Sequence, residues 1–137
     1  MKTIVVDASL LLKFLLDDTP KVIEYVSKLL RDAQKQKISL ISTPLLSLEI
    51  GNGLRYSLKD RQLADDVFEK FLKLPIDIIP LSPAQVQKSL RMAYECNASV
   101  YNASYHILAI SRNSEFATSD KKYFDSAKHL RKIAYIG

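Results

Sequence analysis

The sequence is poor in the residues that punctuate or cross-link a chain. Among 137 residues there are one cysteine, three glycines and five prolines. A single cysteine excludes an internal disulfide and a thiolate cluster for zinc or iron–sulfur, which favours a cytoplasmic protein. We expect Cys96 to be a small packing residue, because no His or Arg arrangement would ionise its thiol. The scarcity of glycine and proline, with 47% hydrophobic residues, favours a helix-rich globular protein over a disordered one.

Long hydrophobic runs are also missing. No apolar stretch approaches the ~20 residues that a transmembrane helix needs, so we expect no membrane segment. The N-terminus enters directly into a strand pattern, without the basic, apolar and small-residue series of a signal peptide. A length of 137 residues suits one domain with a real core, and we predict a single domain over residues 1–137.

Basic residues outnumber acidic ones, with 20 Lys and Arg against 15 Asp and Glu. If three of the acids gather in one site, the remaining surface carries 20 basic against 12 acidic residues (15 less three). Such an excess favours a polyanionic partner. The alternative is charge for solubility alone, because a net charge of +5 is ordinary for a small domain.

The first apolar stretch, Ile4-Val5-Val6, ends on a carboxylate, Asp7. A short run of this kind predicts a strand buried on both faces, as in a parallel sheet. Ligands of open α/β sheets collect at the carboxyl ends of the strands, so Asp7 is placed to do chemistry. The alternative is that Asp7 only caps the helix beginning near Ala8, because Asp is a favoured N-cap residue.

Strand patterns alternate with helix patterns along the chain. Strands are predicted over residues 1–6, 38–42, 76–79, 115–120 and 131–136. Helices are predicted over 8–16, after Thr19-Pro20, after Thr43-Pro44, after Asp60, from the capping box Ser82-Pro83-Ala84-Gln85, from Val100 and over 121–130. This order implies a parallel sheet with right-handed crossovers. We therefore predict an α/β fold, a three-layer α/β/α sandwich with a central, mostly parallel sheet.

The third predicted helix carries an acid among apolar residues. At about 100° per residue, Glu49 lies between Leu45 and Leu46. Burying a lone carboxylate is costly unless it is paired, hydrogen-bonded or bound to a cation. A neighbouring Arg or the backbone could satisfy it, or it could belong to a metal site. Gly51 and Gly53, each costing ~1 kcal/mol against Ala inside a helix, indicate that something approaches the backbone closely there.

Two strand ends and one helix face thus present carboxylates, at Asp7, Asp120 and Glu49, and Asn102 lies on the first turn of a late helix. We expect these four side chains to surround one cleft at the carboxyl edge of the sheet. Hard oxygen ligands select Mg²⁺ or Mn²⁺. Such ions activate water and stabilise an in-line displacement at phosphorus. With a basic remainder of the surface, a nuclease is the simplest chemistry.

Four segments carry a family resemblance: Val6-Asp7-Ala8-Ser9, Leu48-Glu49-Ile50, Tyr101-Asn102-Ala103-Ser104-Tyr105, and Thr118-Ser119-Asp120 before a Lys pair. In order and spacing they resemble the PIN-domain family of metal-dependent nucleases, particularly small prokaryotic toxins of the VapC type. The resemblance runs over nearly the whole chain. It implies a PIN-like, Rossmann-like sandwich, four acidic positions holding one or two Mg²⁺ or Mn²⁺ ions, RNA cleavage, homodimers and often a cognate antitoxin.

The chain departs from this pattern at one position, because Asn102 stands where the family has its third acid. An Asn keeps a carbonyl oxygen that can ligate a metal but loses a unit of negative charge. Metal affinity should therefore fall, most of all for a second ion. Two hypotheses follow: a metal-dependent endoribonuclease, or a PIN-like domain of weak or no catalysis that binds RNA or a protein partner.

In the first hypothesis the site residues have distinct roles. Three carboxylates hold the metal, Asn102 orients it or a water, and two hydroxyls support the site; these residues are Asp7, Glu49, Asp120, Asn102, Ser9 and Thr118. A DNA structure-specific nuclease is a third option, but no insertion provides a helical arch. We also expect a homodimer through helices away from the cleft, because the second to fourth predicted helices carry more apolar surface than one small core needs.

Overall fold

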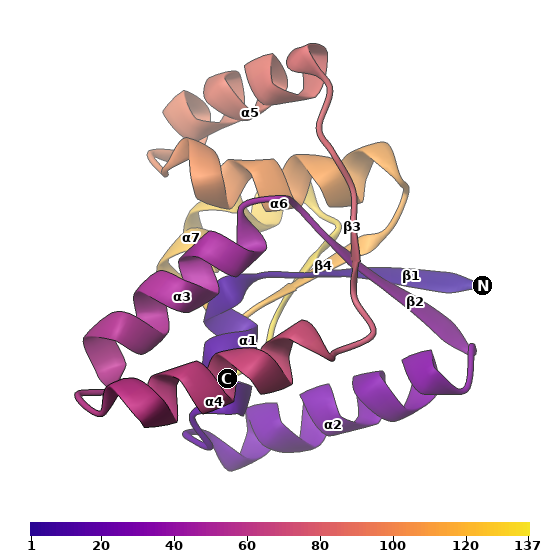
Figure 1. The fold of residues 1–137 in the computed structure, drawn as a ribbon. Helices are drawn as coiled ribbons and strands as arrows, with labels where there is room; N and C mark the ends of the chain where they lie inside the picture. The colour runs from indigo at the N-terminus through magenta and orange to yellow at the C-terminus, as the bar shows by residue number, and fades with distance from the viewer.

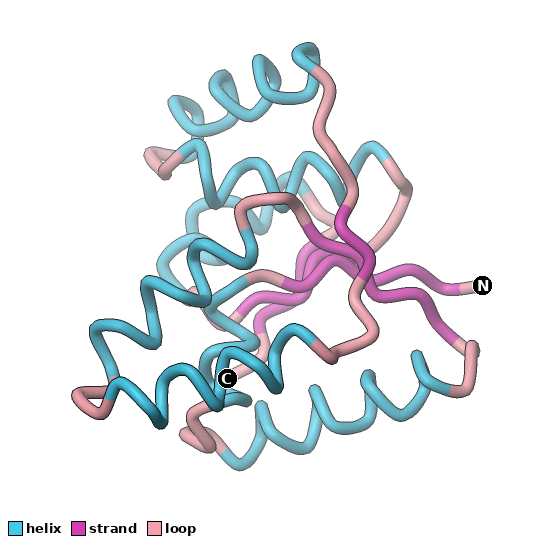
Figure 2. The backbone as a smooth tube through the Cα atoms, viewed as in Figure 1, coloured by secondary structure: helices cyan, strands magenta, loops and turns pink.

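The computed structural model describes residues 1–137 and is built on one five-stranded sheet (Figures 1 and 2). The strands are β1 (Lys2–Val6), β2 (Ile38–Ser42), β3 (Asp77–Ile78), β4 (Glu115–Thr118) and β5 (Ile133–Tyr135), in the spatial order β3-β2-β1-β4-β5. Every neighbouring pair is parallel. Val5 is in register with Ile41 on one side and Phe116 on the other. The first strand is therefore the centre of the sheet.

Helices cover both faces of this sheet. They are α1 (Ala8–Leu15), α2 (Pro20–Gln34), α3 (Leu46–Ser57), α4 (Arg61–Leu72), α5 (Pro83–Cys96), α6 (Val100–Ser111) and α7 (Lys121–Ala127), followed by a 3₁₀ turn, Lys128–Leu130. In Figure 1, α2 lies below the sheet, whereas α6 lies above it with α5 outside. The predicted three-layer α/β/α sandwich with a parallel sheet is confirmed.

The core lies where the central strands meet the inner helices. Ile4, Val5 and Val6 are buried in succession, so β1 faces apolar side chains on both sides, as its composition predicts. Phe116 on β4 and Leu108 on α6 belong to the same cluster of buried hydrophobic residues. None of the helices is long and apolar enough to cross a membrane.

Three predicted element boundaries are wrong. Thr43-Pro44 does not open a helix: the Thr43 hydroxyl accepts a hydrogen bond from the Leu45 N–H at 3.3 Å, which makes a turn, and α3 begins at Leu46. The predicted strand 115–120 ends at Thr118, because the next two residues turn into α7. The predicted strand 76–79 is reduced to an exposed two-residue edge strand, β3, followed closely by Pro80, which has no N–H to donate.

The two glycines of α3 differ in role. A Cβ at Gly53 would overlap the side chain of Leu12 on α1, so Gly53 allows α1 and α3 to approach closely. A Cβ at Gly51 would meet only the Phe68 ring at an ordinary 3.7 Å. The predicted close approach is thus a helix–helix contact at Gly53 and is absent at Gly51.

Candidate functional site

Asp7 follows the central strand and fulfils both of its predicted placements. It caps α1, with Oδ1 accepting from the Leu10 N–H at 3.0 Å, and it faces the carboxyl edge of the sheet. The same oxygen accepts from the Ser9 hydroxyl at 2.8 Å, and Oδ2 accepts from the Thr118 hydroxyl at 2.6 Å. The residue is 3% exposed. Burial raises the pKa of Asp7 to about 6, although the Thr118 hydroxyl opposes this rise.

Asp120 reaches the same edge from the neighbouring strand β4. It caps α7, with Oδ1 accepting from the Tyr123 N–H at 3.0 Å. Its other oxygen accepts from the side-chain amide of Asn102 at 3.2 Å. Asn102 lies on the first turn of α6, where the Ser99 hydroxyl caps its N–H at 3.0 Å. The position that departs from the family pattern is thus hydrogen-bonded directly to an acid of the site.

Glu49 projects from α3 toward the same place and is half-buried. Its partner is neither an Arg nor the backbone, but the hydroxyl of Tyr105 on α6, which donates to Oε1. Tyr105 is 1% exposed. Burial and the adjacent carboxylate raise the pKa of Tyr105, so its hydroxyl stays protonated and remains a donor.

The structure brings the predicted residues to one small cavity of about 300 Å³. The residues that line it are Asp7, Ala8, Ser9, Leu12, Glu49, Asn52, Gly53, Asn102, Tyr105 and Asp120. Thr118 does not line the cavity but holds Asp7 from behind. The molecule has two ion pairs, Lys28–Asp32 and Lys121–Asp125, and neither involves these three carboxylates. No Lys, Arg or His nitrogen therefore lies within 4.0 Å of Asp7, Glu49 or Asp120.

Tyr105 and His106 are neighbours on α6 but have different partners. Tyr105 ends the third resemblance segment, and its contact with Glu49 could not be predicted because it joins two helices. The ring nitrogens of His106 bond the Tyr123 hydroxyl at 2.8 Å and the Arg131 carbonyl at 2.7 Å. Burial lowers the pKa of His106, which fits a neutral, structural imidazole.

The donor chemistry of the cavity fits Mg²⁺ or Mn²⁺, since it offers carboxylate and amide oxygens and no sulfur or imidazole. Asp7 is a buried carboxylate without a protein cation, so a bound cation would compensate its charge. No three acidic, His or Cys side chains are close enough together to form a ready metal cage.

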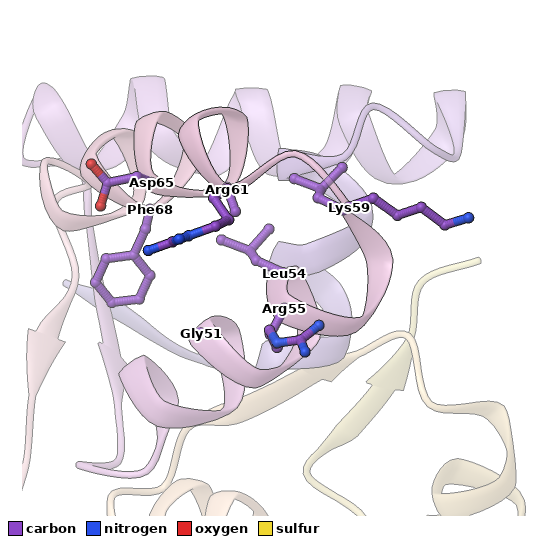
Figure 3. A pocket seen from close by; sticks show the side chains of 9 residues that line it. Gly51, Leu54, Arg55, Lys59, Arg61, Asp65 and Phe68 are labelled. Atoms are coloured by element: carbon purple, nitrogen blue, oxygen red, sulfur yellow. The ribbon is translucent and has the colours of Figure 1, made fainter.

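A second, larger cavity of about 700 Å³ lies between α3 and α4 and contains none of the predicted site residues (Figure 3). It is lined by Gly51, Leu54, Arg55, Leu58, Lys59, Arg61, Ala64, Asp65 and Phe68. In Figure 3, Arg61 extends across the cavity toward Phe68, whereas Lys59 points away from it. We refer to this cavity as the α3–α4 groove.

No family model matches the sequence, and no curated protein matches it. Solved structures do match the fold. VapBC2 from Rickettsia felis, bound to a DNA fragment from its promoter, matches with a TM-score of 0.71 and 10% identity over 98% of this chain and 99% of that chain. PAE2754 from Pyrobaculum aerophilum matches with a TM-score of 0.67 and 23% identity over 91% and 79% of the two chains. A toxin–antitoxin complex from Klebsiella pneumoniae matches with a TM-score of 0.67 and 11% identity over 95% and 94%.

The class defined by this architecture is the PIN-like α/β/α domain, as the sequence resemblance predicted. Within that class, the matched structures agree with the predicted VapC-type resemblance. At these identities the agreement concerns the fold.

Proposed function

We propose that residues 1–137 form one PIN-like domain that acts as a Mg²⁺- or Mn²⁺-dependent endoribonuclease, the toxin of a toxin–antitoxin pair. The observation that carries this proposal is the cavity with three carboxylates, Asp7, Glu49 and Asp120, and no protein cation within 4.0 Å of them. An uncompensated acidic cavity at the carboxyl edge of a parallel sheet is suited to a cation. The basic remainder of the surface suits an RNA substrate.

Each residue of the site has a proposed role. Asp7, Glu49 and Asp120 hold the ion through carboxylate oxygens, and Asn102 orients Asp120 through its amide. Ser9 and Thr118 fix the carboxylate of Asp7 by donating to its two oxygens. When bound, the ion supplies an activated water and charge stabilisation at the scissile phosphate.

A second candidate is a catalytically weak domain that binds RNA or a protein partner. It is favoured by Asn102, whose amide satisfies Asp120 without adding the fourth negative charge. The experiment is a Mn²⁺ titration with a structured RNA, comparing the protein with Asn102→Asp and Asp7→Asn. Metal-dependent cleavage that Asp7→Asn abolishes supports the nuclease. RNA binding without cleavage in both the protein and Asn102→Asp would replace it with the binding domain.

We assign the antitoxin partner to the α3–α4 groove. Its lining includes the apolar residues Leu54, Leu58 and Phe68, and three basic residues, Arg55, Lys59 and Arg61, against one acid, Asp65. A groove between two helices accepts the apolar face of a third helix, and the arginines favour acidic residues on that helix. The matched toxin–antitoxin complex supports the existence of such a partner.

We also propose a homodimer and a cytoplasmic location. Large apolar side chains are exposed on α3 (Leu48, 74%), α4 (Leu72, 63%) and α5 (Tyr94, 83%), whereas α2 exposes none. The proposed contact therefore uses α3 to α5 in place of α2. Light scattering that finds only monomer at micromolar concentration would contradict the dimer. The cytoplasmic location is supported by the single, buried cysteine Cys96.

A further inference from the structure

The three carboxylates of the cavity are fixed in different ways. Asp7 and Asp120 each cap the helix that follows them, through the N–H groups of Leu10 and Tyr123. A cap of this kind fixes a short side chain from its own segment. Glu49 lies in the first turn of α3 and has a longer side chain than an aspartate. Its hydrogen bond comes from Tyr105 on another helix.

Tyr105 is itself held rigidly. It is 1% exposed and lies on α6, which packs against β1 and β4. Its ring stacks on Phe116 with centroids 5.9 Å apart and planes 14° apart. The hydroxyl therefore has a fixed position, from which it can hold the carboxylate of Glu49 at the cavity.

The chemical type of this partner matters as much as its position. An Arg or Lys beside Glu49 would orient the carboxylate but would also compensate its negative charge. A neutral hydroxyl donates one hydrogen bond to Oε1 and leaves the charge in place. The second oxygen, Oε2, stays available to another partner. Such an arrangement preserves the attraction of the cavity for a cation.

We propose that Tyr105 is the positioning residue for Glu49: its buried hydroxyl on α6, hydrogen-bonded to Glu49 on α3, orients that carboxylate for a divalent ion without neutralising it. This inference rests on the proposed metal-dependent function. Hydrogen-bond partners of metal ligands commonly contribute ~10- to 100-fold to metal affinity. Tyr105 thus adds a positioning residue to the four residues of the site predicted from the sequence, Asp7, Glu49, Asn102 and Asp120.

The test is Mn²⁺ binding to the RNA-free protein by calorimetry. Tyr105→Phe removes one oxygen atom and retains the ring that stacks on Phe116, so the variant should fold, which a metal-free melt checks. We expect its Mn²⁺ affinity to fall ~10-fold or more. The matched control is Ser89→Ala, which removes another buried hydroxyl, one that donates to the Gln85 carbonyl within α5, and it should bind Mn²⁺ like the unmodified protein. In cleavage assays, the Mn²⁺ concentration for half-maximal activity should rise similarly, and saturating Mn²⁺ should restore the rate.

A double-mutant cycle separates this inference from the proposed function. If Tyr105 acts through Glu49, adding Tyr105→Phe to Glu49→Gln should cause little further loss of affinity. Unchanged Mn²⁺ affinity in Tyr105→Phe, with a clear loss in Glu49→Gln and Asp7→Asn, would overturn the role of Tyr105 and leave the metal site standing. Unchanged affinity in all three variants would overturn both.

Discussion

Replacing Asn102 with Asp restores the acid that the family pattern places there and has opposite consequences with and without metal. Without metal, Asp120 loses the hydrogen bond from the Asn102 amide at 3.2 Å and gains a negative neighbour at about that distance. Losing a hydrogen bond to a charged group costs roughly 1.5–3 kcal/mol. Two unit charges ~4 Å apart repel by ~1 kcal/mol in water and ~4 kcal/mol at an effective dielectric constant of 20.

Both side chains are partly exposed, so solvent screening moves each contribution to the low end of its range. We expect a metal-free loss of roughly 2–4 kcal/mol in the free energy of unfolding, which lowers the melting temperature of a chain of this length by roughly 6–15 °C. With Mn²⁺ the sign reverses, because a fourth carboxylate attracts the ion, and an ion that binds only the folded form stabilises it by mass action.

Thermal melts with and without Mn²⁺, alongside RNA cleavage, measure both effects. The matched control is Asn52→Asp, which adds a carboxylate to the rim of the same cavity from an exposed position on α3 that has no hydrogen bond to Asp120. It should change the metal-free melt far less than Asn102→Asp. An equal Mn²⁺-induced shift in the unmodified protein and Asn102→Asp, with no RNA cleavage by either, would refute the placement of Asn102 at a metal site.

Three further predictions follow from single features of the structure. Burial raises the pKa of Asp7 from 3.8 to about 6, so between these pH values Asp7 is protonated in the folded protein and ionised in the unfolded chain. The metal-free free energy of unfolding should therefore fall by up to ~3 kcal/mol as pH rises through about 6. Thermal melts of Asp7→Asn over the same pH range should lack this dependence. Gly53→Ala should destabilise the protein by roughly 1–3 kcal/mol through overpacking against α1, whereas Gly51→Ala should be neutral or stabilising by up to ~1 kcal/mol; denaturant titrations that rank the two equally would contradict the assigned close approach. Reversing the charges of Arg55 and Arg61 should weaken binding of an acidic amphipathic peptide at least ~10-fold in fluorescence titrations without changing Mn²⁺ affinity, and unchanged peptide binding would remove the partner from the α3–α4 groove.

The sequence predicted the parts of the site that depend on local pattern. Asp7 could be placed because a buried strand and a helix cap meet at one residue, and Asp120 because the same arrangement recurs after β4. The register of the sheet then brings the two strand ends together. Element order was likewise predictable, because each strand and helix carries its own periodicity.

Two features of the fold and the site could not be predicted in this way. The partner of Glu49 could not be read from periodicity, because Tyr105 lies 56 residues away on another helix. The start of α3 was misplaced because the Thr43 hydroxyl bonds the N–H of Leu45, which forms a turn in place of a helix cap. The first feature is a long-range contact, whereas the second is a local turn that competes with a helix cap for the same hydroxyl.

The bond between the Thr118 hydroxyl and Asp7 joins residues 111 positions apart and closes nearly the whole chain into one loop. The entropy of closing a long loop must be overcome before such a contact forms, so we expect it to form late in folding. An incomplete chain that lacks β4 has Asp7 without Thr118 and without Asp120. Under the proposed function, the complete acidic cavity, and with it any nuclease activity, would form only after synthesis has passed β4.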